Sequence, residues 1–547
     1  MRLTTIVVAA LAASISSGQA VPPPKWYDGD VHVHVQQCDD LAILTDAELV
    51  AELKANDVSV GCVQYWNPDH TDLSAPVYFN VFEPLITGTE IFTGDPSVVM
   101  QAGFELSGFH AQQFGHLQVL GASDGWIPNL PYLAPIIAYI KQTSPYALIG
   151  FAHARWLKSY QQLTPALIQH IWNPEIPADA IMGGVSFVEA YMFDDAGAID
   201  PRALYYKLSN VGLRIAFVGG SDNSCIWDAI GDVRTYARVE GPLTYQSWIR
   251  AIRARRTTVS LGKDYFLNLE VNGQGIGSEL SLPGPGTVAA RVTLVASIGM
   301  PSSGTVRVLR GGDVAASIPY DLPAGGTFTA AAQVSVPESD WLAVEADVNG
   351  ATKAHTSATY ITVAGKLIVK AKDADYWVSI LQTMADNIGV YNLDPQSEAE
   401  LLGYLEEAKA MYEALAAYAK PLNASVSKIG VSTPACSGSI AAGLLGTPSA
   451  GASIVLTCLN APPNASGYLL ATTEQNQSMP INGIVSYVGM HPAMVVPVAV
   501  NAGGFCQYEP IIGSGIAGKT IYAQWIFVNP QGCGGLLSSS DGIAVSF

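Results

Sequence analysis

Apolar runs of strand length alternate with helical patterns from residue 26 to about residue 264. Four of these runs have the length and composition of buried strands: residues 58–63, 147–152, 184–191 and 215–219. A helix is predicted before the first of these runs, because Thr45 and Glu48 have the spacing of a capping box and Leu49, Val50 and Leu53 follow at helical spacing. This alternation of β and α units predicts a parallel sheet or barrel.

The pattern changes near residue 265. Short β-branched runs, such as residues 288–295 and 305–309, are separated there by Gly, Pro and Ser, which is typical of a β-sandwich. A helical segment follows, because Ser397 and Glu400 form a second capping-box pattern. Its apolar face would consist of Leu401, Leu405, Ala408, Tyr412 and Leu415. The rest of the chain is dense in Gly, Ser and Pro, which indicates a second β-rich module.

These changes divide the chain into five predicted parts. They are a signal peptide (1–20), an α/β unit (26–264), an immunoglobulin-like β-sandwich (265–372), a helical segment (373–423) and a disulfide-bearing β-rich module (424–547). The signal peptide is indicated by Arg2, an apolar stretch over residues 6–15 and the small-x-small cleavage site Gly18-Gln19-Ala20. No later run is long and apolar enough to span a bilayer. We therefore expect a secreted or periplasmic protein without membrane insertion.

The composition favours large folded cores and excludes several kinds of partner. Of the 547 residues, 49% are hydrophobic and 13% are charged, so disorder is not expected. The formal net charge is −19, from 46 acidic and 27 basic residues. That charge argues against nucleic acid or an anionic membrane surface as a partner.

The seven cysteines are distributed unevenly along the chain. Export permits disulfides, and we expect two bridges, of undetermined connectivity, among the four cysteines of the last module. These four are Cys436, Cys458, Cys506 and Cys533. In the first half, either Cys38 pairs with Cys62, or these two and Cys225 are buried thiols. No CxxC motif is present, so a thiolate zinc site is not expected.

Side chains that bind metals accompany the predicted strands. His32 and His34 lie two apart on a short alternating run, so a strand would point both imidazoles to the same side. Such a pair suits zinc and other borderline divalent metals. More residues of this kind adjoin the other apolar runs: Glu105, His116, His153 and Asp222. In a barrel, reactive residues gather at the carboxyl ends of the strands, where these six side chains could hold two divalent metals.

The order of these residues resembles the metallohydrolases of the polymerase and histidinol phosphatase (PHP) superfamily. The order is HxH, then Glu, then Gly-His-Leu, then Ala-His, then Gly-Ser-Asp. The CehA/McbA-like branch is the closer match, through Val233-Arg234-Thr235-Tyr236, the segment over residues 241–273, and His355-Thr356-Ser357. The resemblance covers roughly residues 26–385.

The resemblance implies a distorted seven-unit (β/α) barrel, similar to a TIM barrel, with a metal site at its rim. It would assign His32, His34 and Asp222 to a first metal, with Glu105 bridging to a second metal held by His116 and His153. It implies one or two divalent metals as cofactors, with zinc favoured over manganese or iron.

The activity implied by the resemblance is hydrolysis by a metal-activated water. The substrate would be a small ester, amide, carbamate or phosphoester. Asp222 could also take a proton from the water. Arg234 would pair with an anionic group of the substrate, or else form a salt bridge near the rim. Glu189, at another predicted strand end, is expected to be a supporting residue rather than a ligand.

Two departures from the PHP pattern keep a second interpretation open. The segment after the second strand is Cys62-Val63-Gln64-Tyr65-Trp66 instead of a Thr-Asp-His segment, and Asp222 is followed by Asn223 and Ser224 without the usual histidine. Both losses argue against a trinuclear phosphatase-type site. The alternative is a non-catalytic surface or binding protein on a degenerate barrel, with the C-terminal module contacting a cell surface or another protein.

Overall fold

The computed structural model describes most of the chain. The described residues are 20, 22–35, 44–66, 86–106, 114–128, 130–154, 156, 174–193, 195–197, 199–223, 229–297, 299, 301–436, 438–449, 451–489, 494–530 and 535–547. Residues 1–19 of the expected signal peptide lie outside these ranges, as do Cys38, Cys225 and Cys533. None of the described helices is long and apolar enough to cross a membrane.

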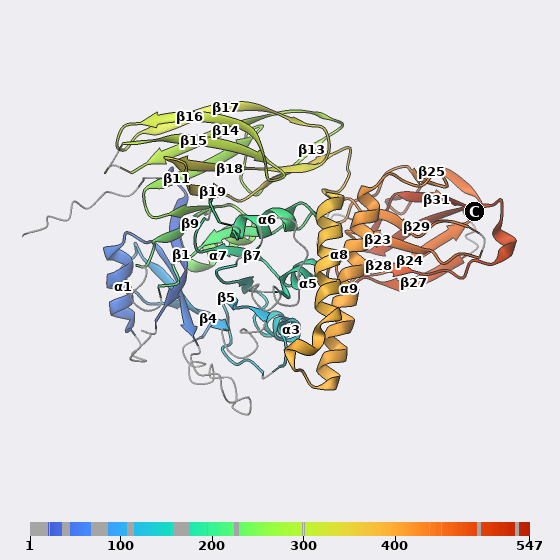
Figure 1. The fold of residues 1–547 in the computed structure, drawn as a ribbon, viewed down its shortest axis with the longest axis horizontal. Helices are drawn as coiled ribbons and strands as arrows, with labels where there is room; N and C mark the ends of the chain where they lie inside the picture. Colours follow the sequence, from blue (N-terminus) through green and yellow to red (C-terminus); the bar gives the residue numbers. More distant parts are fainter. Residues whose placement is uncertain are drawn as a thin grey trace, which may run out of the picture.

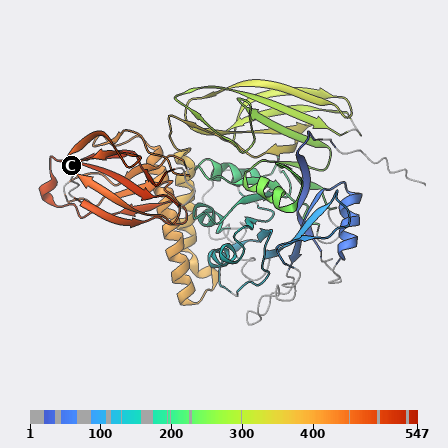
Figure 2. The same ribbon diagram turned by 180° about the vertical axis from the view of Figure 1, so that it is seen from behind.

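Figure 1 shows three bodies of structure around a helical pair. The N-terminal part begins with β1 (Trp26–His34) and ends with β10 (Thr257–Leu261). The β-sandwich strands lie above it, and the C-terminal β module lies on the far side of α8 (Ala371–Asp386) and α9 (Pro395–Ala419). The view from behind shows the same helical pair between the N-terminal part and the C-terminal module (Figure 2).

One sheet organises the N-terminal part, in the order β10-β9-β1-β2-β4-β5-β6-β7-β8. Its further strands are β2 (Val60–Trp66), β4 (Val99–Leu106) with the short β3 (Glu90–Ile91) beside it, β5 (Leu117–Leu120), β6 (Leu148–Phe151), β7 (Phe187–Ala190), β8 (Ala216–Gly219) and β9 (Val233–Arg238). The helices are α1 (Asp46–Ala55), α3 (Leu133–Thr143), α5 (Ile176–Ile181), α6 (Pro201–Ser209) and α7 (Tyr245–Arg253). The sheet is curled, so that β8, at the end of this order, lies close to β1. The Asp222 N–H, just after β8, donates to the His32 carbonyl on β1 at 3.1 Å.

The expected (β/α)7 barrel is wrong. A barrel of that type needs parallel neighbours, but β5 pairs antiparallel with both β4 and β6, and β1 pairs antiparallel with β9. Strands make up 41% of the structure and helices only 21%. The apolar runs predicted the strands themselves but not their directions, because strand direction is set by backbone hydrogen bonds between segments far apart in the sequence.

Local sequence signals were more successful than the predicted topology. The capping box of α1 is confirmed: the Glu48 N–H donates to the Thr45 hydroxyl at 3.3 Å, and the Thr45 N–H donates to the Glu48 carboxylate at 2.8 Å. Helix α9 begins earlier than predicted, because Asp394 is its N-cap and Pro395 its first residue. Its predicted apolar face is confirmed as buried.

The β-sandwich has two layers with a shared apolar core. One layer consists of β11 (Tyr265–Val271), β12 (Gln274–Gly275), β14 (Gly286–Ala296) and β17 (Thr327–Val336). The other consists of β13 (Glu279–Leu282), β15 (Ser302–Arg310), β16 (Asp313–Leu322), β18 (Asp340–Val348), β19 (Ala351–Thr356) and β20 (Thr359–Val363). Because β19 pairs with β10, this second layer continues the sheet of the N-terminal part.

The C-terminal module consists of short antiparallel sheets around a core that includes Trp525 and Phe527. Its strands are β21 (Val426–Ile429), β22 (Ala441–Leu445), β23 (Val455–Leu459), β24 (Ser466–Thr472), β25 (Gln475–Ile481), β26 (Ile484–Val488), β27 (Met494–Ala499), β28 (Cys506–Tyr508), β29 (Thr520–Val528), β30 (Leu537–Ser539) and β31 (Gly542–Ser546).

The expectation of two disulfides among the four C-terminal cysteines is wrong. Cys436 is disulfide-bonded, but Cys458 and Cys506 are buried free thiols that lie opposite each other on β23 and β28. Cys62 is also a buried free thiol, so it does not pair with Cys38. Cysteine spacing cannot predict which sulfurs meet, because pairing depends on tertiary contacts.

Candidate metal centre

The six predicted ligands converge at one edge of the curled sheet. His34 ends β1, Glu105 lies near the end of β4, and His153 and Asp222 follow β6 and β8. His116 comes before β5 rather than after it, and β5 runs antiparallel to its neighbours. The start of β5 therefore lies at the edge where those other strands end. The antiparallel strand that excludes the predicted barrel thus brings His116 to the site.

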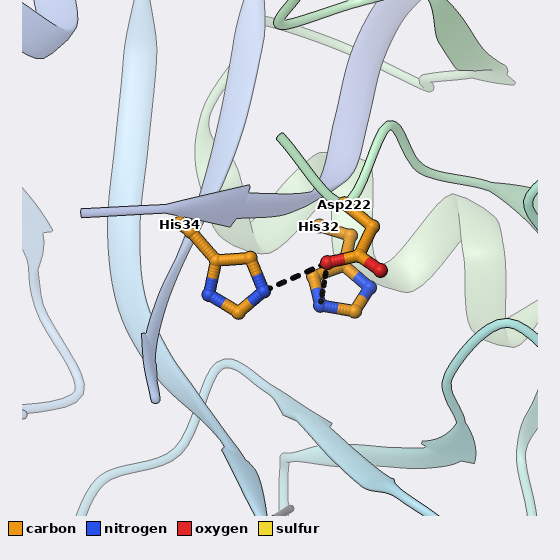
Figure 3. A group of neighbouring side chains, drawn as sticks. All are labelled: His32, His34 and Asp222. Carbon is orange, nitrogen blue, oxygen red and sulfur yellow. Dashed lines mark hydrogen bonds and ion pairs between the residues drawn. The ribbon is translucent and has the colours of Figure 1, made fainter. Parts of the chain in front are cut away.

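His32, His34 and Asp222 form the first group of ligand atoms, all within 4.8 Å of one another. The Asp222 Oδ1 atom lies 3.0 Å from His34 Nε2 and 3.6 Å from His32 Nε2. Figure 3 shows both imidazole rings, which come from positions two apart on β1, turned toward this carboxylate. The same-side placement of the two histidines, predicted from their spacing, is confirmed.

Glu105, His116 and His153 form a second group within the same distance limit. The Glu105 Oε1 atom lies 2.7 Å from His116 Nδ1 and 3.3 Å from His153 Nε2. The other oxygen, Oε2, lies 3.4 Å from the Nε2 atoms of both His32 and His34. Glu105 therefore faces one group with each oxygen.

Both carboxylates of the centre are ionised at neutral pH. Burial alone would raise the pKa of Glu105, but the charges of His32 and His116 and hydrogen bonds from the surrounding imidazoles hold it well below its usual range. Burial also opposes ionisation of Asp222, yet the charge of His32 and a hydrogen bond from His34 lower its pKa to about 2. Two negative charges in a largely buried site favour a cation.

His32 is the most enclosed ligand, with no exposed surface. Burial alone would lower its pKa, but the carboxylates of Glu189, Asp222 and Glu105 raise it well above its usual range. Its Nε2 atom is buried and makes no hydrogen bond. Buried polar atoms normally have a partner, and a metal ion between this nitrogen and the two carboxylates would provide one. The residues present therefore fit a metal, and the cluster could hold one.

Two ligands have unusual backbone conformations. The φ angles of His153 and Asp222 are +32° and +49°, in the left-handed region that non-glycine residues seldom adopt. Such conformations cost free energy and persist where surrounding contacts impose them, most often at functional sites. His153 lies two residues after β6 and Asp222 three residues after β8, so each side chain reaches the centre from the turn that follows its strand.

Asp30, which was not among the predicted site residues, supports the site. Its buried carboxylate accepts hydrogen bonds from the N–H groups of His32, Ser221 and Gly231, at 2.9, 3.0 and 2.8 Å, and from the Ser221 hydroxyl at 2.5 Å. Burial raises the pKa of Asp30 to about 6 despite these bonds. Its position in the sequence, two residues before His32, was the signal that could have identified it.

Arg234 is not brought to the cluster. It is buried and ion-paired with Asp28, with Nη1 and Oδ2 2.8 Å apart. Its remaining N–H groups donate to the backbone carbonyls of Gly231, Asn56 and Asp57. Of the two roles expected for Arg234, a substrate contact or a salt bridge, the structure has the salt bridge. Among the described residues, none of these hydrogen-bond and ion-pair partners is a metal-ligand residue.

Comparison with known proteins leaves the family unassigned. No protein family and no curated protein matches the chain. Three solved structures illustrate how weak the structural likenesses are. They are Pseudomonas fluorescens alkylpurine DNA glycosylase AlkC bound to DNA (15% identity, 22% of this chain, 38% of that chain, TM-score 0.15), the human OSCAR ligand-binding domain (9%, 50%, 95%, 0.15) and a tetra-tandem repeat from the extending region of a large adhesion protein (9%, 58%, 56%, 0.16).

These likenesses carry no argument about fold or function, because their TM-scores are far below the level of a shared fold. The chain also spans only 38% of the glycosylase and 56% of the adhesion repeat. The resemblance to the PHP superfamily stays a hypothesis based on motif order.

Proposed function

We propose that this protein is an exported, metal-dependent hydrolase. The observation that carries the proposal is the position of Glu105, whose two oxygens face two separate groups of ligand atoms. A carboxylate in this position can be shared by two ions. The motif order that resembles the PHP superfamily and the signal-peptide pattern at the N-terminus support the same conclusion.

The donor set suits borderline divalent metals, with zinc favoured over manganese or iron. His32, His34 and Asp222 would hold one ion, and His116 and His153 a second, with Glu105 between them. When bound, such ions supply Lewis acidity and lower the pKa of a bound water to about 7. No separate nucleophilic side chain is then required.

The exposure of the ligands indicates how substrate reaches the centre. The side chains of Asp222 and His116 are each 24% exposed, whereas those of His32, His34, Glu105 and His153 are at most 8% exposed. Substrate and water would therefore approach past Asp222 and His116. The ionised Asp222 carboxylate can accept a hydrogen bond from the attacking water and so orient it.

We propose a small ester, amide, carbamate or phosphoester as the substrate. The two groups of ligand atoms that Glu105 faces could hold one or two ions. The chain lacks the additional motif residues of a trinuclear phosphatase-type site. Carbonyl substrates are therefore as well supported as phosphoesters.

The first test is metal content by elemental analysis on protein purified without chelator. Wild type is expected to carry one to two equivalents of transition metal and to hydrolyse at least one class in a panel of esters, amides, carbamates and phosphoesters. The double variant His32→Ala/His34→Ala is expected to lose metal and activity.

His355→Ala is the matched control, because His355 is as buried as His32 but lies on β19 and contacts the Tyr206 hydroxyl at 2.7 Å. It should lower stability and retain metal. Wild-type protein without metal and without activity would contradict the proposal and favour a non-catalytic binding protein.

A further inference from the structure

We propose that Glu189 is the positioning residue of this centre, which orients the His32 ring and holds the His153 backbone. This inference rests on the proposed function, because the two residues that Glu189 positions are proposed ligands. Glu189 lies on β7, between the strands that lead to His153 and Asp222. Its side chain has no exposed surface.

The contacts of Glu189 join ligands from two strands. Both of its carboxylate oxygens lie 3.1 Å from His32 Nδ1. Its Oε2 atom also accepts a hydrogen bond of 2.7 Å from the backbone N–H of His153. That is the residue whose φ angle is +32°, so the bond contributes to holding an unfavourable conformation.

The hydrogen bond to His32 determines which ring nitrogen faces the centre. A carboxylate accepts but does not donate, so His32 Nδ1 must carry the proton that is shared with Glu189. The opposite nitrogen, Nε2, is the one that faces Glu105 and Asp222. With Nδ1 protonated, Nε2 can present a lone pair to an ion, and the carboxylate makes the imidazole a stronger donor.

Gly220 provides the space that this arrangement needs. A Cβ atom at Gly220 would lie 2.3 Å from Glu189 Oε1, 2.6 Å from the His32 Cβ and 2.9 Å from the His32 backbone nitrogen. Any larger residue there would displace Glu189, His32 or both. The glycine of the Gly-Ser-Asp motif is thus explained by the close packing of a ligand and its positioning carboxylate.

The test compares Glu189→Gln with wild type. Glutamine has nearly the same shape, but its amide has one acceptor oxygen and one donor group. With its oxygen at the Oε2 position it can still accept from the His153 N–H, but it loses the negative charge and places an NH2 donor at the Oε1 position, 3.1 Å from the protonated His32 Nδ1. Zn²⁺ affinity is measured by competition with a chromophoric chelator, and ligand geometry by the visible absorption of the Co²⁺-loaded protein. We expect affinity about 10- to 100-fold lower and an altered Co²⁺ spectrum.

Two further variants separate positioning from a general effect of mutation. Glu175→Gln makes the same change at an equally buried glutamate, which accepts from the N–H groups of Leu133 and Ala134. It should leave both readouts unchanged. Gly220→Ala should reproduce the effect of Glu189→Gln, whereas Gly403→Ala on α9, where a Cβ meets nothing within 4 Å, should not.

The outcomes distinguish this inference from the proposed function. If wild type binds Zn²⁺ and Glu189→Gln binds it equally well with the same Co²⁺ spectrum, the positioning role is refuted while the metal centre stands. Equal losses in Glu189→Gln and Glu175→Gln would also refute it. If wild type binds neither ion, the proposed function fails and this inference with it. If Glu189→Gln does not fold, Gly220→Ala decides by the same two measurements.

Discussion

The carboxylate of Asp30 accepts hydrogen bonds from both the backbone N–H and the hydroxyl of Ser221, at 3.0 and 2.5 Å. Asp30 lies two residues before His32, and Ser221 lies directly before Asp222. One buried carboxylate therefore fastens the first ligand strand to the last ligand segment. Because no backbone ladder joins β1 and β8, these side-chain bonds and the Asp222 N–H bond to the His32 carbonyl hold the two together.

Replacing Asp30 should loosen this connection. Asp30→Ala leaves the N–H groups of His32, Ser221 and Gly231 buried without their acceptor, at a cost of about 1–3 kcal/mol for each group. We expect the free energy of unfolding to fall by at least about 3 kcal/mol, together with weaker metal binding. Ser221→Ala removes only the hydroxyl bond and should cost about 1 kcal/mol. Equal stability of wild type and Asp30→Ala in denaturant titrations would contradict this account.

The shared position of Glu105 predicts an asymmetry between two ligand variants. Glu105→Ala should remove both ions, because its oxygens face both groups of ligand atoms. His34→Ala should remove only the ion of the first group, because His34 faces Asp222 and a single oxygen of Glu105. Elemental analysis after dialysis measures both. Loss of the same amount of metal in the two variants would show that Glu105 is not shared.

Arg234 should matter for stability rather than for substrate. Arg234→Ala removes the guanidinium from the buried ion pair with Asp28, and breaking a buried pair typically costs about 3–5 kcal/mol. Arg256→Ala is the control, because Arg256 is 41% exposed and pairs with an exposed Glu240, a type of contact worth about 0–1 kcal/mol. Unfolding in denaturant measures both. Unchanged stability with a raised KM in Arg234→Ala would instead indicate a substrate contact.

A buried carboxyl on α5 predicts a pH effect on stability away from the metal centre. Burial and the charge of Glu175 raise the pKa of Asp179 well above its usual range, although the Tyr404 hydroxyl donates to it. A raised folded-state pKa stabilises the fold below the unfolded pKa of about 3.9. This contribution is lost as pH rises toward the folded value.

Asp179→Asn should therefore be more stable than wild type at pH 7–8, with a difference that shrinks toward pH 4. Asparagine keeps an acceptor for Tyr404, and the other oxygen of Asp179 makes no hydrogen bond. A gain of about 1 kcal/mol would raise Tm by roughly 2–4 °C. Thermal unfolding at several pH values measures the difference. A difference in stability between Asp179→Asn and wild type that is the same at every pH would rule out ionisation of Asp179 as its cause.

The sequence by itself determined the local features of this protein. Helical spacing and a capping box predicted α1, because both depend on residues within one or two turns of each other. The two-residue spacing of His32 and His34 placed both rings on one side of β1, because side chains alternate along a strand. Order along the chain also identified Glu105, His116, His153 and Asp222 as members of the same cluster.

Only the tertiary structure decided how these pieces are arranged. The reversed direction of β5, which excludes the barrel and brings in His116, depends on hydrogen bonds to β4 and β6. The free thiols of Cys458 and Cys506, the inward pairing of Arg234 with Asp28, and the contact of Glu189 with His32 likewise join residues far apart in the sequence. Residue type and spacing determine local conformation, whereas long-range contacts depend on how the whole chain packs, and no short pattern encodes that packing.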